Sequence, residues 1–289
     1  MSKIPPTVVT PALLDTLRGQ EDLPDDVWYI VVATALAILN RPEEIQTVYK
    51  HAIARRDHGE RDGQGDGGVS LADHEQLRIT RRLREALLKT SAIGGLPKTI
   101  NALQELKKVV PAHLSDEPGG ESPTGRRRDI YGTPSPQVLD RGETFFNQCY
   151  GKVAERVRTS LDHCGTEDLG LAVRLTYAYV LSPAAVLSEA ETSFVMIAGL
   201  IPQDGTALGE PPFRGAATSS ARANASTTEQ VNPQLKGHLK GALNGGARVE
   251  EVRAVRQVAV DVCRAAGMRL LTGEDAPGGW GWRAEVQNL

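Results

Sequence analysis

The chain has 289 residues, a formal net charge of −3 at pH 7 and a hydrophobic share of 40%. This length suits one large domain or two modest ones, and the hydrophobic share is too high for a chain that is disordered throughout. The slightly negative charge provides no overall positive field for phosphates, so the composition excludes a general nucleic-acid-binding protein.

The sequence shows neither a signal peptide nor a membrane span. Its opening, MSKIPPTVVTPALLDTL, has prolines where a signal peptide needs an uninterrupted apolar core. The longest apolar run, 30–39, is far shorter than the ~20 residues that cross a bilayer. The three cysteines form no CxxC pair, which fits a reducing compartment. We therefore expect no membrane association and a cytoplasmic location, with a mitochondrial one as the alternative.

Four helices are predicted in the first part of the chain. Acidic residues or a proline stand where helices begin, and leucines recur at helical spacing within them. A charged, glycine-rich loop over 56–68 separates the second helix from the third. The expected helices cover 25–39, 42–54, 71–93 and 98–110.

The second part of the chain continues in the same style, and no segment alternates as a strand does. We therefore predict an all-α fold. A segment rich in small residues, between Gln203 and Gln230, has no periodicity and is either disordered or a lid. The helices expected in this part cover 141–161, 168–181, 188–201, 234–244 and 249–267.

Composition also suggests how the chain is divided. The stretch 111–136 is rich in proline and glycine and carries the run Arg126-Arg127-Arg128, which is either a docking or phosphate site or, as we favour, a solvated charge cluster in a linker. On each side an apolar helix is followed by a helix with a histidine and then by an arginine-rich helix, which suggests an internal duplication. The predicted divisions are a first repeat, a linker, a second repeat and a tail, at 1–110, 111–136, 137–272 and 273–289.

The stretch Asn232 to Gly246 carries the most concentrated chemical signal. On a helix, Gln234, His238 and Gly241 share one face, and the glycines near His238 leave room for a ligand or another helix. An imidazole titrates near neutral pH, so His238 could act as a general acid or base. Spacing alone favours the other interpretation, a buried histidine hydrogen-bonded across a helix contact.

Other candidate residues lie around this stretch. Tyr177, Tyr179 and Glu191 are the candidates for orienting His238, although each residue type is more often structural in a helix. The remaining histidines and the cysteines lack metal-ligand spacing, and no nucleotide-binding or nucleophile-elbow motif is present. We therefore expect neither a metal nor another cofactor.

The second half resembles the carboxymuconolactone decarboxylase family, whose fold is shared with alkyl hydroperoxide reductase D (AhpD). The histidine motif and the acidic helix start after it carry most of the resemblance, and the first half matches more faintly. Counting back from His238, the reductase cysteine positions fall on Gln234 and Val231, and the reductase glutamate position falls on Ser193, so the resemblance does not extend to a CxxC peroxidase. The matching segments are 191–200, 238–246 and 249–253.

This resemblance implies an AhpD-like helical bundle with two related repeats, assembled as a homo-oligomer, a dimer or trimer of duplicated chains. It also implies a cofactor-free decarboxylase or related lyase that acts on a small carboxylated lactone or β-keto acid. His238 would protonate the enolate, with Glu191 and Tyr177 as its catalytic neighbours. The residues expected to bind the carboxylate substrate are Lys236, Lys240, Gln234, Asn244 and Gly241.

Two other functions stay open. The missing cysteines and the altered glutamate position favour a non-catalytic assembly or scaffolding protein, in which His238 and the glycines serve helix packing. A weaker alternative is a thiol-based redox protein that uses Cys149 or Cys164.

Overall fold

The computed structural model describes residues 7–54, 72–116, 123–204 and 232–268. It confirms the predicted all-α fold: the described residues form helices joined by turns and contain no β-strand. The expected loop over 56–68, most of the segment 203–230 and the tail from 273 lie outside the described residues. Among the described helices, none is both long and apolar enough to span a bilayer.

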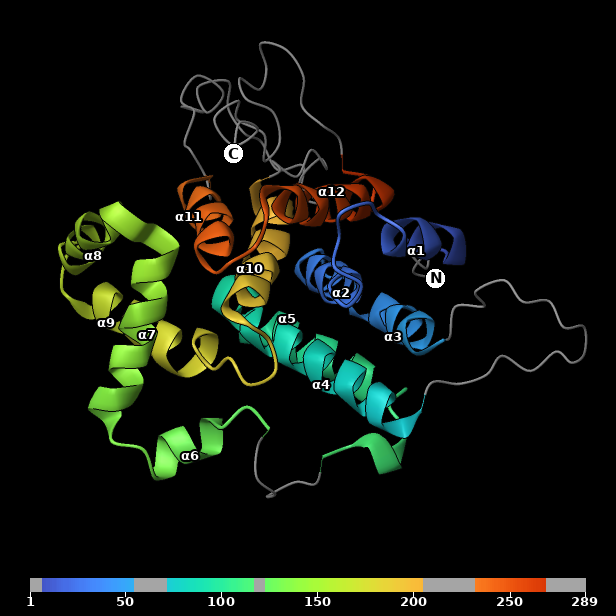
Figure 1. Ribbon diagram of the computed structural model, residues 1–289, viewed down its shortest axis with the longest axis horizontal. Coiled ribbons are helices and arrows are strands. Elements are labelled where there is room, and N and C mark those ends of the chain that lie inside the picture. Colours follow the sequence, from blue (N-terminus) through green and yellow to red (C-terminus); the bar gives the residue numbers. More distant parts are fainter. Residues whose placement is uncertain (1–6, 55–71, 117–122, 205–231, 269–289) are drawn as a thin grey trace, which may run out of the picture.

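Helices from both halves of the chain share one hydrophobic core (Figure 1). At its centre α2 (Trp28–Ile38) packs against α10 (Glu189–Asp204). Every residue of α2 is buried, which explains why its sequence is apolar on all sides. Around this pair lie α3 (Ile45–Ile53), α4 (Asp73–Lys89) and α12 (Val249–Ala265).

The remaining helices of the first half follow ordinary sequence signals. Thr10 caps α1 (Pro11–Arg18), a short helix that the sequence analysis missed. The 3-10 turn η1 (Pro42–Glu44) starts with a proline and leads into α3. Gly95, with φ of 77°, kinks α5 (Ser91–Lys107) near its start, where the sequence predicted a break between two helices.

A second group of helices lies beside the core, joined to α10 through α11, and positions the candidate site (Figure 1). In this group α7 contacts α11, and the π-helical turn η4 continues directly from α9 and packs against α7. The expected linker 111–136 contains η2 and α6 and the first residues of α7. η2 (Ala112–Leu114) contacts α4 and lies outside this group. The bounds of the group are α6 Arg126–Tyr131, α7 Ser135–Tyr150, η3 Gly151–Val153, α8 Ala154–Asp162, α9 Asp168–Leu175, η4 Thr176–Leu181 and α11 Asn232–Asn244.

Candidate functional site

His238 lies inside the fold, next to two tyrosines from other elements. Its side chain is 5% exposed, and its Nε2 atom lies 3.5 Å from the hydroxyl of Tyr177 in η4. The hydroxyl of Tyr177 also interacts with that of Tyr150, at the end of α7. The three side chains therefore form a polar chain from half-buried Tyr150 to buried His238, assembled from α7, η4 and α11.

Burial keeps all three side chains neutral near pH 7. It lowers the pKa of His238 to about 4, since the charged imidazolium loses its hydration there. It also raises the pKa of Tyr150 and holds that of Tyr177 well above 10.0. The Nδ1 atom of His238 is buried and has no hydrogen-bond partner among the described residues. The arrangement can thus orient a neutral polar group, but His238 holds no proton to donate as an imidazolium at neutral pH.

Tyr177 is presented by an unusual piece of backbone. The segment Thr176–Leu181 is π-helical, and the amide of Ser182 donates to the carbonyl of Tyr177, five residues earlier, at 2.8 Å. Such turns are rare and often mark functional sites. Its location beside His238 is therefore a second indication, independent of the histidine itself, that this region is functional.

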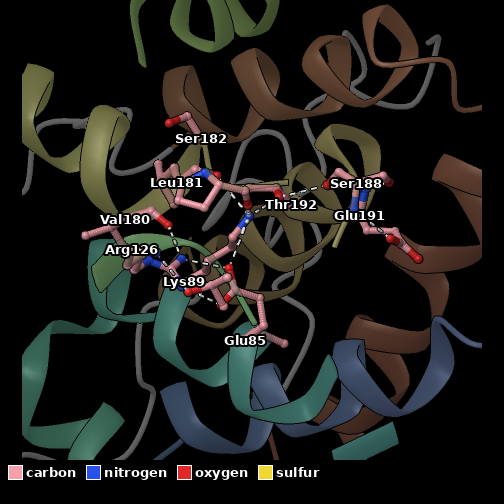
Figure 2. Close-up of polar contacts among 12 residues, drawn as sticks. Glu85, Lys89, Arg126, Val180, Leu181, Ser182, Ser188, Glu191 and Thr192 are labelled. Atoms are coloured by element: carbon pink, nitrogen blue, oxygen red, sulfur yellow. Dashed lines mark hydrogen bonds and ion pairs between the residues drawn. The ribbon is translucent and has the colours of Figure 1, made fainter. Parts of the chain in front are cut away.

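Three cationic side chains hold the end of the π-helical turn. Arg141 donates to the carbonyl of Ala178 at 3.1 Å. Arg126 donates to those of Tyr179 and Val180 at 3.0 and 2.7 Å, and Lys89 donates to those of Leu181 and Pro183 at 2.9 and 2.8 Å. Figure 2 shows Lys89 and Arg126 converging on this stretch from α4 and α6. Carbonyls at a helix end lack helical partners and carry partial negative charge, so cations suit this position.

Within this polar cluster, the charges are also paired with one another. Both ends of the Arg126 guanidinium bind the carboxylate of Glu85, which is 1% exposed (Figure 2). Lys89 is fully buried and lies 3.5 Å from the same carboxylate, and it also donates to the hydroxyl of Thr192 at 2.5 Å. Burial nevertheless lowers the pKa of Lys89 to about 8. Full hydrogen bonding is what makes such buried charges tolerable.

A basic cleft opens on the solvent side of Tyr150. It has a volume of about 630 Å³ and lies between α11, the end of α7, η3 and α8. Four cationic side chains line it, and its lining includes no acidic residue. None of the four forms an ion pair with a described residue. They are Lys152, Arg156, Lys236 and Lys240.

Most of the residues expected to bind substrate face this cleft. Gln234, Lys236, Lys240 and Asn244 all line it, and the Asn244 amide also donates to the carbonyl of Gln148 at 2.7 Å. Sequence analysis missed Lys152 and Arg156, because they come from a different segment and no motif links them to α11. Their proximity is a tertiary relationship that periodicity cannot reveal.

The glycines beside His238 serve helix packing. A Cβ atom on Gly241 would lie 3.0 Å from the Cα atom of Cys149, and one on Gly237 would lie 2.9 Å from the ring of Tyr150. Of the two possibilities raised by the sequence, a close ligand or a close helix, the structure shows the close helix at Gly241. Gly237 also lines the cleft.

Glu191 is directed elsewhere. Its carboxylate binds Arg82 at 2.6 Å and accepts from the amide of Ser188 at 2.8 Å. Although burial raises its pKa, Arg82 outweighs that effect and keeps it below the usual value. Glu191 therefore has partners of its own and makes no described hydrogen bond to His238. Among the described residues, no cluster of histidine, cysteine, aspartate and glutamate could hold a metal ion.

Fold and site together define an all-α protein with a basic cleft over a buried tyrosine–histidine pair. Peroxisomal protein 2 of Schizosaccharomyces pombe is 32% identical over 241 residues, which cover 83% of this chain and 87% of that protein. Peroxisomal protein 2 of Saccharomyces cerevisiae is 28% identical over 284 residues, or 86% of this chain and 91% of that protein. The chain belongs to the family of these peroxisomal proteins. No family model and no solved structure matches it.

These relatives correct two expectations from the sequence. Their name denotes a peroxisomal protein and not a decarboxylase, so the expected decarboxylase or lyase function is wrong. The expected cytoplasmic location, with its mitochondrial alternative, is wrong for the same reason. The family resemblance misled on function because it depended on residues around His238, several of which serve helix packing here. The scaffolding and thiol-based alternatives gain no support from the relatives' name.

Proposed function

We propose that this chain is a peroxisomal protein that binds a small carboxylate in the basic cleft. The observation that carries the binding proposal is the charge of the cleft: four cationic side chains line it without one acidic residue. Its volume of about 630 Å³ lies within the range of ordinary small-molecule sites. The hydroxyl of Tyr150 and the amides of Gln234 and Asn244 add neutral hydrogen-bonding groups at the same surface.

The ligand should carry more than one carboxylate group. Lys152, Arg156 and Lys240 are exposed, so each one alone attracts an anion by only about 0.2–1 kcal/mol in water. A ligand that contacts several of them adds these small attractions together, whereas a monocarboxylate uses one or two. The combined field also speeds association at low ionic strength.

Calorimetric titration can test this proposal with butyrate, succinate and tricarballylate, which carry one, two and three carboxylates. We expect affinity to rise along this series and to fall with added salt. The double variant Lys236→Gln/Lys240→Gln should bind tricarballylate about 2- to 25-fold more weakly. Lys50→Gln, an exposed lysine on α3, is the matched control and should bind as the unaltered chain does. Unchanged affinity in the double variant would refute carboxylate binding in this cleft.

The proposed location rests on the two relatives named peroxisomal protein 2. It can be tested by expressing the full chain with an internal fluorescent label in yeast and comparing it with a peroxisomal marker. Coincident punctate signals are expected. A diffuse signal in cells with normal peroxisomes would contradict the proposal.

We further propose that the helices form an AhpD-like arrangement with two related repeats. Equivalent neighbours support the duplication: α2 packs against α4 and α12, and α10 does the same. Moreover, each of α2 and α10 is followed by a helix with a histidine, His51 in α3 and His238 in α11. Superposition of α2–α4 on α10–α12 in an experimental structure tests the repeat. Different helix crossing angles in the two halves would contradict it.

A homo-oligomer is proposed as well. Large apolar side chains are exposed on α6, α7 and α9, which lie toward one side of the fold (Figure 1). Tyr131 and Ile130, at 78% and 60% exposed, are the most prominent on α6, and Leu175 on α9 is 53% exposed. Exposed apolar side chains that gather on one side of a protein can mark an interface with another protein. Light scattering after size-exclusion chromatography tests this, and a monomeric mass at all concentrations would overturn it.

A further inference from the structure

A second cavity lies on the other side of Tyr177 from His238. It has a volume of about 200 Å³, lies between α7, α8, α9 and η4, and is partly open to solvent. Its walls are mainly apolar side chains from these elements, and the ring of Tyr177 forms part of them. The main apolar contributors are Leu139, Phe146, Leu161 and Val173.

The charged residues of this cavity are already neutralised by their neighbours. Arg158 pairs with Glu143 at 3.0 Å and also with Glu155, and it donates to the side chain of Asn147. Arg174 pairs with Asp162 at 2.5 Å. Arg158, Glu143 and Arg174 are the charged residues that line the cavity, so each one has an opposite charge beside it. No unpaired charge remains among them to attract an ionic ligand.

The two cavities therefore differ sharply in chemistry although they are neighbours. Phe146 packs on Tyr150 and Tyr177, with ring centroids 4.6 and 4.9 Å apart, so these aromatic rings stand between the apolar cavity and the cleft. One helix serves both sides: Arg156 and Val157 of α8 line the basic cleft, whereas Arg158 and Leu161 line the apolar cavity.

We propose that the apolar cavity binds an uncharged hydrocarbon group about the size of a substituted benzene ring. An apolar cavity of about 150 Å³ in a protein can hold benzene, and about 200 Å³ leaves room for one or two further carbons. Burial of apolar surface supplies the affinity. A carboxylate is excluded because it would lose its hydration without gaining a free cation.

The proposal can be tested by titrating the full chain with toluene and with its charged counterpart benzoate. Toluene should bind with 1:1 stoichiometry. Leu161→Trp fills the cavity and should weaken toluene binding at least tenfold. Leu171→Trp is the matched control: the same substitution on α9 at an exposed leucine that does not line the cavity, expected to leave binding unchanged. Val173→Trp provides a second filled variant in case Leu161→Trp unfolds, which circular dichroism reports.

Each other result has a defined meaning. Equal toluene affinity in folded Leu161→Trp, or no toluene uptake at all, would overturn the proposal. Self-association that Leu161→Trp abolishes, without toluene uptake, would also overturn it and would assign the cavity to a second copy of the chain. Any benzoate binding should depend on Lys236 and Lys240 and not on Leu161. Failure of toluene binding would therefore leave the proposed carboxylate site unaffected. Failure of carboxylate binding in the basic cleft would likewise leave the proposed apolar site unaffected.

Discussion

Arg126 binds Glu85 with both ends of its guanidinium group, at 2.6 and 2.7 Å, and thereby joins α6 to α4. The same guanidinium donates to the carbonyls of Tyr179 and Val180. It therefore connects a segment expected to be a solvated linker with the backbone that presents Tyr177. Arg126 is therefore not the solvated residue that the sequence analysis favoured. A run of arginines in a sequence does not show that one of them pairs with a buried carboxylate.

Removing this arginine should destabilise the fold. Arg126→Ala leaves the carboxylate of Glu85 buried with only Lys89 nearby, and the free energy of unfolding should fall by about 3–5 kcal/mol. Arg127→Ala is the control, because Arg127 is exposed and stacks only on Tyr131; its cost should stay below about 1 kcal/mol. Urea unfolding measures both. Equal losses in the two variants would show that the Arg126–Glu85 ion pair adds no more stability than an exposed arginine does.

His238 should make stability depend on pH in the acidic range. The folded protein protonates it near pH 4, whereas the unfolded chain does so near 6.5, so the unfolded state binds more protons between those values. The free energy of unfolding should therefore fall as the pH drops from 6.5 to 4, by about 3 kcal/mol for this group. Urea unfolding at several pH values measures the slope.

In that experiment, His238→Gln should show a shallower slope than the unaltered chain. Carboxylates also titrate in this range. The contribution of His238 is therefore given by the difference in slope between the unaltered chain and His238→Gln. Identical slopes for His238→Gln and the unaltered chain would mean that His238 is not buried in a neutral state.

Gly142 of α7 should tolerate no side chain. A Cβ atom there would lie 2.5 Å from the Cα atom of Ala178 and 2.6 Å from its amide nitrogen, both in the π-helical turn. Gly142→Ala should therefore cost about 1–3 kcal/mol in the free energy of unfolding. Gly132→Ala is the control, since its nearest contact would be 3.5 Å away, and thermal unfolding should show a change within about 0.5 kcal/mol.

The three cysteines should differ in reactivity. Cys164 is exposed, whereas Cys149 and Cys263 are buried. Burial raises the pKa of the Cys149 thiol to about 12 and that of Cys263 further still, so neither forms a thiolate near pH 7. Iodoacetamide should modify one site in the native protein and three in urea, as counted by intact-mass spectrometry. Rapid native modification of Cys149 would revive a thiol-based role for the site.

The sequence predicted the helices well because their signals are local. Caps, prolines and helical spacing placed α2, α3 and α12 within a few residues of where they lie. The same signals located His238, Lys236 and Lys240 on one helix. What these signals could not show is which helices become neighbours.

The rest of the site is determined by which helices pack together in the folded chain. Lys152 of η3 and Arg156 of α8 join the cleft because the fold places these elements across it from α11, and no spacing in the sequence links them to Lys240. Lys89 offers another case. A lysine in an amphipathic helix ordinarily faces solvent. Lys89 is nevertheless fully buried, and it donates to the carbonyls of Leu181 and Pro183.

The π-helical turn also limits how this chain can change its length. A π-helical turn contains about one residue more than the α-helical turn it replaces. Deleting a single residue from Thr176–Leu181 would allow ordinary α-helical bonding, but every side chain on one side of the deletion would rotate by ~100° about the helix axis. Tyr177 could then keep its contact with His238 only if the carbonyls that follow it moved out of reach of Arg126 and Lys89. The length of this segment is thus as much a part of the site as its residues.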